Sequence, residues 1–211
     1  TEHLYRTATR SIAAIEVPKE PWVVAMDVDE TLLNNVEYNR RRDLLGLGYS
    51  SESWADWVKE ESATPVPGSI EFVTQVLEKG GLIVLITNRE RELDLNTWNN
   101  LVALGFPVSR NNTCIMGRSQ ADRNSVGTQG MINDKDLRRN QIATGTANYC
   151  WENYPEAQEV WNKPLSIIFE VGDNIKDFSQ TTQDNVDTKD FMERISTDVL
   201  LLPNAVYGSW E

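Results

Sequence analysis

Five short, apolar stretches along the chain predict buried β-strands. They are Trp22–Asp27, Leu82–Thr87, Thr113–Met116, Ser166–Val171 and Val199–Leu202. Short apolar runs are typical of strands that are covered on both faces of a sheet. Segments with helical spacing lie between the first and second of these strands and between the second and third. This alternation predicts an α/β fold with a parallel, Rossmann-like sheet and helices on both faces.

Helical spacing of apolar residues is clearest in three segments. Leu4–Ile15 precedes the first strand, Ser69–Lys79 precedes the second, and Glu90–Leu104 follows the second. Gly80 and Gly105 come directly after the last two segments, and glycine is the residue that most often ends a helix. We therefore expect these two segments to be the crossover helices that flank the second strand.

The stretch from 32 to 67 departs from this alternation. It is long and rich in aromatic residues, and Asn34–Leu45 and Ser51–Glu61 within it have an amphipathic helical pattern. It lies between the first strand and the first crossover helix. We interpret residues 32–67 as a small helical cap inserted over the carboxyl edge of the sheet. Residues 1–31 and 68–211 then form the α/β core.

The charge of the chain limits its partners. It has 20 basic and 32 acidic residues and a formal net charge of −12. Such a field repels nucleic-acid backbones and anionic membrane surfaces, and no apolar run is long enough for a transmembrane helix. It also repels an anionic substrate, unless a bound divalent metal reverses the sign locally. We expect no nucleic-acid partner and no transmembrane segment.

Scarce residue types limit the chemistry. The only histidine is His3, near the amino end, which argues against phosphohistidine chemistry and zinc sites built on imidazole. Neither Cys114 nor Cys150 has an arginine six positions later, so a cysteine-phosphatase loop is absent. The two cysteines either pair in an oxidising compartment or are two small buried apolar residues. The chemistry must therefore run on carboxylates.

Polar residues follow two of the predicted strands directly. Asp27 and Asp29 follow the first, where the alternation of side chains puts both carboxylates on the same side. Thr87, Asn88 and Arg89 follow the second, where a hydroxyl and backbone N–H groups suit a phosphate oxygen. Taken alone, each pattern also fits an ordinary helix cap or polar turn.

A lysine and a second pair of acids come later in the chain. Lys135 has the charge to neutralise a phosphoryl group, and Asp173 and Asp177 follow the fourth predicted strand. Mg²⁺ prefers a few carboxylates together with water and substrate phosphate. A solvated lysine and an Asx-turn are the alternative interpretations. Because ligands of open α/β sheets bind beyond the carboxyl ends of the strands, the four groups together predict one site there.

In this order, the four groups resemble the motifs of the haloacid dehalogenase superfamily. Within it, the chain is most similar to the bacterial class C acid phosphatases, the outer-membrane lipoprotein type. The similar segments are residues 27–35, 67–68, 86–89, 135–138, 171–178 and 202–208. In two places the chain departs from the family. Asp136 stands where the family usually has serine, which makes Arg138 the alternative to Lys135 as the phosphoryl contact, and the stretch 139–163 is longer than expected.

The resemblance implies roles for the residues of these motifs. Asp27 is the nucleophile that forms an aspartyl phosphate, and Asp29 is the general acid and base. Thr87 and Lys135 hold the transferring oxygens. Further contacts with the substrate are expected at Thr31, Asn88 and Arg89.

The resemblance also implies a magnesium ion. The Asp27 carboxylate, the main-chain carbonyl of Asp29 and the Asp173 carboxylate are expected to hold Mg²⁺. Asp177 is expected to complete the metal site by orienting the water ligands of the ion, or to orient Lys135. The function that follows is that of a magnesium-dependent acid phosphatase, a phosphoric monoester hydrolase.

The substrate is less constrained. In class C relatives an aromatic residue of the insert and a tyrosine of the tail flank the base of a nucleoside monophosphate, and Trp54 and Tyr207 match them. Such stacking contributes on the order of 1–3 kcal/mol per base. Alternatively, both residues pack the cap onto the core. There are three alternative functions: a sugar-phosphate phosphatase, a phosphotransferase, and a magnesium-binding storage-type protein with little turnover.

Location and assembly depend on the resemblance alone. Class C relatives are exported and often lipid-anchored, so we expect a protein of the periplasm or the outer membrane. The sequence does not decide the oligomeric state, and a homodimer stays open.

Overall fold

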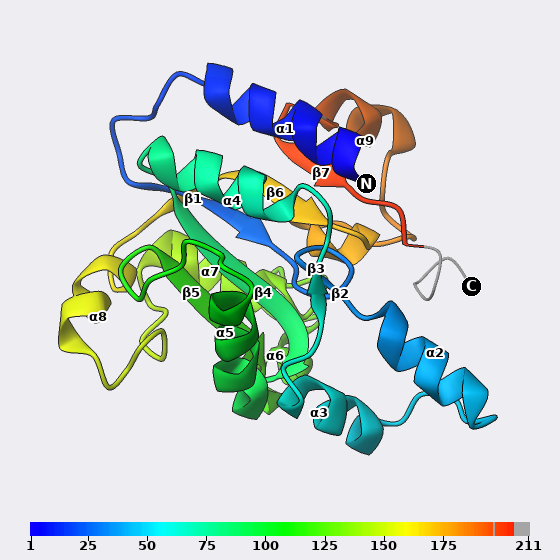
Figure 1. Ribbon diagram of the computed structural model, residues 1–211. Coiled ribbons are helices and arrows are strands. Elements are labelled where there is room, and N and C mark those ends of the chain that lie inside the picture. Colours follow the sequence, from blue (N-terminus) through cyan, green and yellow to red (C-terminus); the bar gives the residue numbers. More distant parts are fainter. Residues whose placement is uncertain (196, 205–211) are drawn as a thin grey trace.

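A five-stranded parallel sheet forms the centre of the molecule (Figure 1). The computed structural model describes residues 1–195 and 197–204. The strands of the sheet are β1 (Trp22–Met26), β4 (Leu82–Glu90), β5 (Thr113–Arg118), β6 (Ser166–Gly172) and β7 (Val199–Leu201). Their order is β5-β4-β1-β6-β7, and all neighbouring strands are parallel. The predicted fold class and the five predicted strands are confirmed.

Nine α-helices are present in the part of the chain that the structure describes. They are α1 (Glu2–Ala14), α2 (Val36–Leu44), α3 (Ser51–Lys59), α4 (Ser69–Glu78), α5 (Asp94–Ala103), α6 (Gln120–Ser125), α7 (Asp136–Thr144), α8 (Pro155–Trp161) and α9 (Thr188–Arg194). Two short 3₁₀ helices are η1 (Arg91–Leu93) and η2 (Ile175–Asp177). The sequence pattern predicts no helix at α6, α8 or α9. Within these residues, no helix combines the length and apolarity that crossing a bilayer requires.

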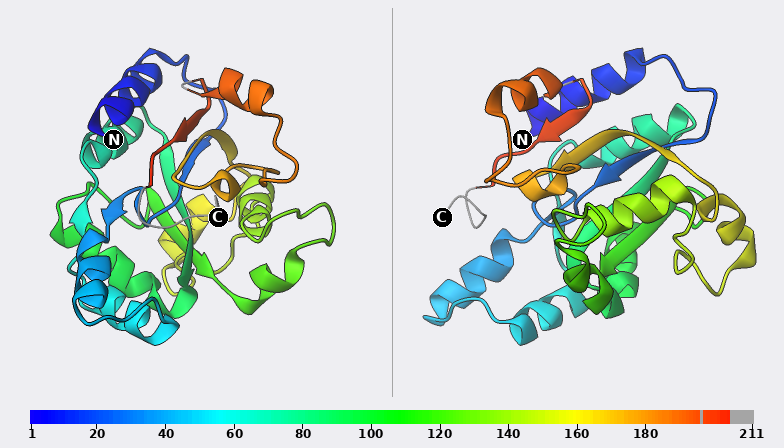
Figure 2. Two further views of the ribbon diagram at one scale, coloured as in Figure 1. Left: turned by 90° about the vertical axis from the view of Figure 1, so that its right-hand side faces the viewer. Right: turned by 180° about the vertical axis from the view of Figure 1, so that it is seen from behind.

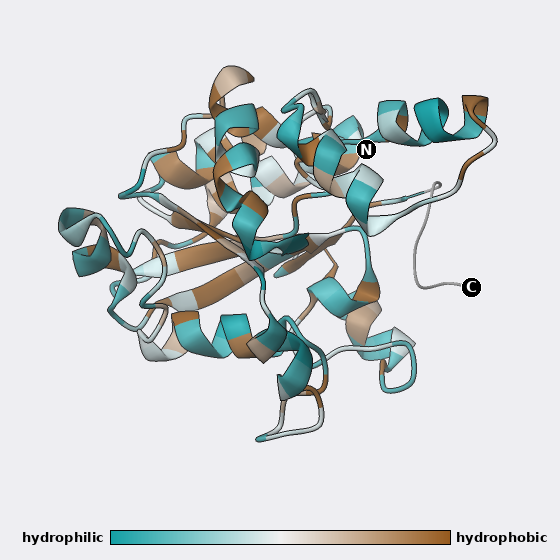
Figure 3. Ribbon diagram, turned by 90° about the horizontal axis from the view of Figure 1, so that it is seen from below, coloured by the Kyte–Doolittle hydropathy of each residue, from teal (hydrophilic) through white to brown (hydrophobic). Residues whose placement is uncertain are grey.

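Alternating residues of β1 bury themselves in two separate cores. Val24 and Met26 pack with residues of α1, α4 and α5 on one face of the sheet. Val23 and Ala25 pack with residues of α7 and α8 on the other face. Successive side chains of a strand point to opposite faces, so a strand covered on both sides must be apolar throughout. Figure 3 shows the strands as mainly hydrophobic ribbons between helices of mixed character.

The long segment between α7 and β6 is fastened to the amino end of the sheet. A disulfide joins Cys114 of β5 to Cys150. The indole N–H groups of Trp151 and Trp161 donate hydrogen bonds to the carbonyl oxygens of Thr113 and Arg110, both at 2.8 Å. The two cysteines, which the sequence left as either a pair or two buried apolar residues, are therefore paired and buried.

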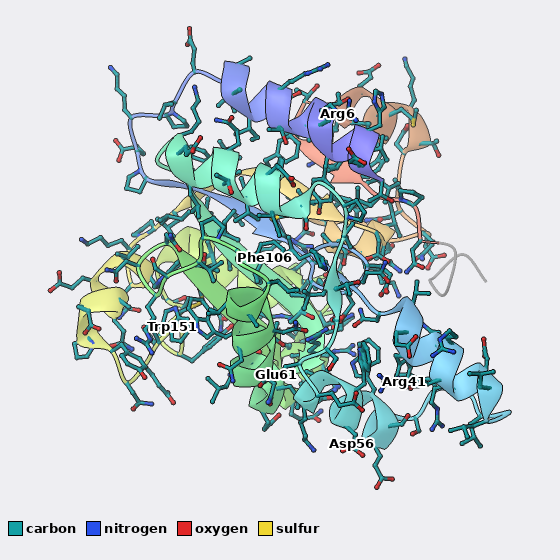
Figure 4. The ribbon with its side chains drawn as sticks, in the orientation of Figure 1. Arg6, Arg41, Asp56, Glu61, Phe106 and Trp151 are labelled. Carbon is teal, nitrogen blue, oxygen red and sulfur yellow. A yellow bond between two sulfur atoms is a disulfide. The ribbon has the colours of Figure 1, made fainter. Side chains whose placement is uncertain are left out.

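The inserted segment leaves and rejoins the core through a two-stranded antiparallel ribbon. Its strands are β2 (Leu33–Asn34) and β3 (Thr64–Pro65), and α2 and α3 lie between them. Glu61 accepts hydrogen bonds from the side chains of Asn96 and Asn99 on α5, both at 2.9 Å (Figure 4). Both predicted helices are present. The division of the chain into a cap and a core stays a prediction.

Candidate active site

Asp27 lies where the connections of the sheet diverge. β1 is central, and the chain continues from it to β4 on one side and later to β6 on the other. In α/β sheets, such a point leaves a crevice at the carboxyl ends of the strands. The backbone N–H of Asp27 donates to the carbonyl oxygen of Val171 at 2.9 Å, which extends the pairing of β1 with β6. The left panel of Figure 2 faces this edge of the sheet.

Lys135 bridges two of the predicted acidic residues. Its Nζ lies 2.5 Å from Oδ1 of Asp27 and 2.6 Å from Oδ1 of Asp177. Lys135 is the residue before α7, and its side chain is almost fully buried. Burial lowers the pKa of Lys135, but the carboxylates of Asp177 and Asp27 outweigh it and raise this pKa above its ordinary value. The lysine therefore stays charged beside Asp27.

Three carboxylates converge around this lysine. One ligand oxygen from each of Asp27, Asp173 and Asp177 lies within 4.8 Å of the others, and all three residues are buried. Burial raises the pKa of Asp27 well above its ordinary value, and it raises that of Asp173 to about 7. One ammonium does not neutralise three carboxylates. Buried oxygen ligands with excess negative charge are what a hard divalent cation requires, so the cluster fits such a metal.

The loop after β6 is shaped to bring Asp173 and Asp177 together. Gly172 has no side chain, and a Cβ there would lie 2.2 Å from Cβ of Asp177. The backbone N–H of Asn174 donates to Oδ2 of Asp177 at 2.8 Å. The side-chain amide of Asn204 donates to Oδ2 of Asp173 at 2.7 Å. Any larger residue at position 172 would push Asp177 out of the cluster.

Asp29 is held by Arg89 of β4. Nη2 of Arg89 lies 2.7 Å from Oδ1 of Asp29, and Nη1 of the same residue donates to Oγ1 of Thr97 at 3.0 Å. Asn35 adds a hydrogen bond from Nδ2 to Oδ1 of Asp29 at 3.0 Å, and its Oδ1 accepts from the Trp57 indole at 2.8 Å. Asp29 is therefore positioned both by Arg89 of β4 and by Asn35 at the start of α2.

The sequence analysis did not single out Asn35 as a positioning residue. An asparagine at the start of a predicted helix fits a capping role, and only the fold shows that it faces Asp29 and Trp57. Asn204, which holds Asp173, was missed for the same reason, since its partner is far away in the sequence.

Thr31, Thr87 and Arg138 are fully buried and do not line the cavity described below. The hydroxyl of Thr31 donates to Oδ1 of Asp173 at 3.4 Å, and Oγ1 of Thr87 accepts from the backbone N–H of Arg89 at 3.1 Å. Both threonines are fully buried. Arg138 donates to the carbonyl oxygens of Thr87 and Met116, at the ends of β4 and β5. Of the two candidate cations, Lys135 therefore enters the site and Arg138 supports the strands.

Asp136, the departure from the family pattern, has a structural role. Its Oδ2 accepts from the backbone N–H groups of Ile132 and Asn133 at 3.0 and 2.9 Å, and its Oδ1 pairs with Arg139 at 2.8 Å. Arg139 also pairs with Glu170 of β6 at 3.0 Å. These contacts hold the start of α7, and with it Lys135, against the loop that follows β6.

A cavity of about 540 Å³ opens above these groups. The predicted site residues that line it are Asp27, Asp29, Trp54, Asn88, Arg89, Lys135, Asp173 and Asp177. The inserted segment also contributes Tyr38 and Tyr49. The ring of Trp54 lies 5.0 Å from that of Tyr38 and 6.3 Å from that of Tyr49. Tyr207, the second predicted base contact, lies outside the described residues.

Comparisons with known proteins agree with this geometry. The family described as "HAD superfamily, subfamily IIIB (Acid phosphatase)" matches residues 2–210. Two solved structures of the class C acid phosphatase from Bacillus anthracis, one with tungstate bound, share the fold at 24% sequence identity. They have TM-scores of 0.71 and 0.68, and the matches cover 99% of this chain and 78% and 80% of those chains. This chain belongs to the acid phosphatases of the haloacid dehalogenase superfamily, subfamily IIIB, and is a phosphoric monoester hydrolase.

Proposed function

We propose that the protein is a magnesium-dependent phosphomonoesterase that works through an aspartyl phosphate at Asp27. The observation that carries the proposal is the ion pair between Asp27 and Lys135 on the floor of the cavity, beside Asp173 and Asp177. A carboxylate in this setting combines a nucleophile with nearby positive charge for the transferring phosphoryl group.

The chain supplies the nucleophile and the acid. A carboxylate oxygen of Asp27 attacks phosphorus, a new P–O bond forms, and the bond from phosphorus to the ester oxygen breaks. Asp29 donates its proton to the departing alkoxide. Water then attacks the phosphorus of the aspartyl phosphate while Asp29 takes up a proton, which releases orthophosphate and restores Asp27.

Faster turnover at acidic than at neutral pH is the expected pH dependence, because the chain belongs to a family of acid phosphatases.

The metal would be held by the Asp27, Asp173 and Asp177 carboxylates, with the main-chain carbonyl of Asp29 as a further ligand. The carboxylate of Asp29 is not one of the three clustered groups. When bound, Mg²⁺ supplies positive charge that offsets the negative charge of the site and the phosphoryl group.

Nucleoside 5′-monophosphates are the substrates that the cavity supports best, alongside other small esters. Trp54 and Tyr49 offer aromatic surface on the same cavity as Asp27, within stacking reach of a base. Sugar phosphates also fit a polar cavity of this size, so a sugar-phosphate phosphatase or a phosphotransferase is the second candidate. A storage-type protein that binds Mg²⁺ but turns over poorly is the third.

Hydrolysis of p-nitrophenyl phosphate with Mg²⁺, and again after EDTA, tests the enzyme proposal. Rapid turnover that EDTA abolishes and Mg²⁺ restores is the expected result. A purified, folded protein with no turnover in Mg²⁺ leaves only the storage-type function. A panel of nucleotides and sugar phosphates then separates the first two candidates.

Trp54→Ala tests the base contact directly. We expect KM for a nucleoside monophosphate to rise about tenfold, and KM for p-nitrophenyl phosphate to change little. Equal effects on both substrates would mean that Trp54 only packs the insert onto the core.

We further infer that the protein works outside the cytoplasm, in the periplasm or on the outer membrane. The buried Cys114–Cys150 disulfide supports this location, because such bonds persist mainly in oxidising compartments. Fractionation of the producing cells tests it. Whether two copies associate stays a prediction, and light scattering of the purified protein would measure it.

A further inference from the structure

Most charged side chains that line the cavity have partners of opposite charge. Arg89 pairs with Asp29, and Lys135 pairs with Asp27 and Asp177. Two further pairs at the cavity are Arg118 with Asp134 and Glu90 with Arg123. These cations are therefore already ion-paired in the absence of substrate.

Lys176 is the exception among the cations that line the cavity. Its side chain is exposed, and among the described residues its ammonium has no ion pair or hydrogen bond. Unpaired lysines on a protein surface are usually solvated charges without a specific role. What distinguishes this one is that it lines the same cavity as Lys135, whereas Lys135 is 2% exposed and lies at the bottom.

The backbone of Lys176 is held firmly. Its N–H donates to Oδ1 of Asn174 at 3.1 Å, and its carbonyl oxygen accepts from Nη2 of Arg139 at 3.2 Å. The next residue, Asp177, is fixed by Lys135. The side chain of Lys176 is therefore presented from a rigid turn, which lowers the entropic cost of using it to bind a ligand.

The position of Lys176 decides which part of a substrate it meets. In the proposed function the transferring phosphoryl group meets Asp27 and Lys135 at the bottom of the cavity, so the mouth receives the alcohol part of the ester. In a protein with a net charge of −12, an unpaired cation at that mouth offers an anion a local attraction.

We propose that Lys176 forms a subsite for a second anionic group, a phosphate or a carboxylate, on the alcohol part of the substrate. This proposal rests on the proposed function, because the phosphoryl end of the ester must be held at Asp27. It makes the enzyme prefer monoesters with a second negative charge over neutral alcohol esters of the same size.

Two matched substrate pairs test the subsite with Lys176→Met. One pair is glycerol 3-phosphate and 3-phosphoglycerate, which differ in a carboxylate. The other is a nucleoside 5′-monophosphate and its 3′,5′-bisphosphate. We expect the variant to raise KM about fivefold for the member with two anionic groups in at least one pair, with kcat unchanged. The members with a single anionic group should be unaffected. The responding pair identifies the anion.

Lys19→Met is the control variant. Lys19 is an exposed lysine before β1, at the amino end of the sheet, so the variant changes net charge by the same amount far from the cavity. If both variants raise KM equally, only the overall field is involved and the subsite does not exist. Equal KM values of Lys176→Met and wild type for all four esters would also overturn it.

A binding measurement separates this proposal from the proposed function. In an Asp27→Asn background, calorimetry measures the Kd of each ester without turnover. Loss of the preference for doubly charged esters on adding Lys176→Met supports the subsite even if wild-type protein does not hydrolyse them. No change in Kd overturns the subsite even if wild-type protein is an active phosphatase.

Discussion

Two buried ionic clusters lie on either side of the start of α7. The first, which we call the catalytic cluster after its proposed role, consists of Asp27, Lys135, Asp173 and Asp177 and opens into the cavity. The supporting cluster consists of Asp136, Arg139, Glu170 and Arg194, and Arg139 joins its two acids. Consecutive residues, Lys135 and Asp136, therefore belong to different clusters.

The two clusters differ in their charge balance. Three buried acids face one lysine in the catalytic cluster. In the supporting cluster the two buried acids face two arginines, and the half-buried Arg194 also pairs with the partly exposed Asp198 at 2.9 Å. Buried charges without compensation destabilise a fold, so an excess persists where a ligand completes it. The difference supports a stabilising role for the supporting cluster, and it supports the proposal that a cation completes the catalytic cluster.

Replacing the nucleophile should give the largest effect. Asp27→Asn keeps the shape of the residue but removes the attacking oxygen anion. We expect kcat for p-nitrophenyl phosphate to fall on the order of 10⁴-fold or more, while circular dichroism and the unfolding temperature stay close to wild type. Turnover near the wild-type rate would remove Asp27 from the nucleophile role.

Breaking the supporting cluster should act on stability. Arg139→Met leaves Asp136 and Glu170 without their shared partner, and the free energy of unfolding should fall by about 3 kcal/mol. Urea unfolding measures it. Arg10→Met, at an exposed position of α1, is the control and should change stability by less than about 0.5 kcal/mol. Similar values for the two variants would contradict a supporting role.

Removing one acid from the catalytic cluster should raise the free energy of unfolding, whereas Arg139→Met lowers it. In EDTA near pH 8, Asp173→Asn removes a negative charge from an acidic excess, so stability should rise by about 1 kcal/mol. The rise in unfolding temperature that Mg²⁺ gives the wild-type protein should disappear in the variant. Destabilisation in EDTA, as large as that of Arg139→Met, would mean that the two clusters do not differ.

The smallest effect is expected at Asp94, a buried acid that belongs to neither cluster. Burial raises its pKa to about 7. A carboxyl whose pKa is higher in the folded than in the unfolded state favours folding at low pH, and this contribution is lost as pH rises from about 4 through 7. Asp94→Asn should therefore reduce the loss of stability between pH 5 and pH 8 by about 1 kcal/mol. An unchanged pH slope of urea unfolding would contradict this.

The sequence predicted the sheet and its catalytic edge because both depend on local signals. Trp22–Met26 is apolar at every position since both faces of β1 are covered, and Asp27 marks the end of that run. Parallel strands bring their carboxyl ends to one edge, so Asp27 after β1, Arg89 near the end of β4 and Asp173 after β6 meet there.

Contacts between distant polar residues could not be predicted in the same way. Asn35 fits a helix cap, and Arg139 fits a solvated helix face, until the fold places them beside Asp29 and Glu170. Nothing local to these residues indicates their partners. The helix α8 was missed because its short polar sequence is held by Trp161 and the nearby disulfide more than by its own periodicity.

Trapping the phosphorylated enzyme tests the central claim most directly. Protein quenched during turnover of a phosphate ester is treated with borohydride, which reduces an acyl phosphate of aspartate to homoserine, and its peptides are sequenced by mass spectrometry. We predict homoserine at position 27 only, formed with substrate and absent without it. Reduction at another residue, or none during demonstrable turnover, would contradict an aspartyl phosphate at Asp27.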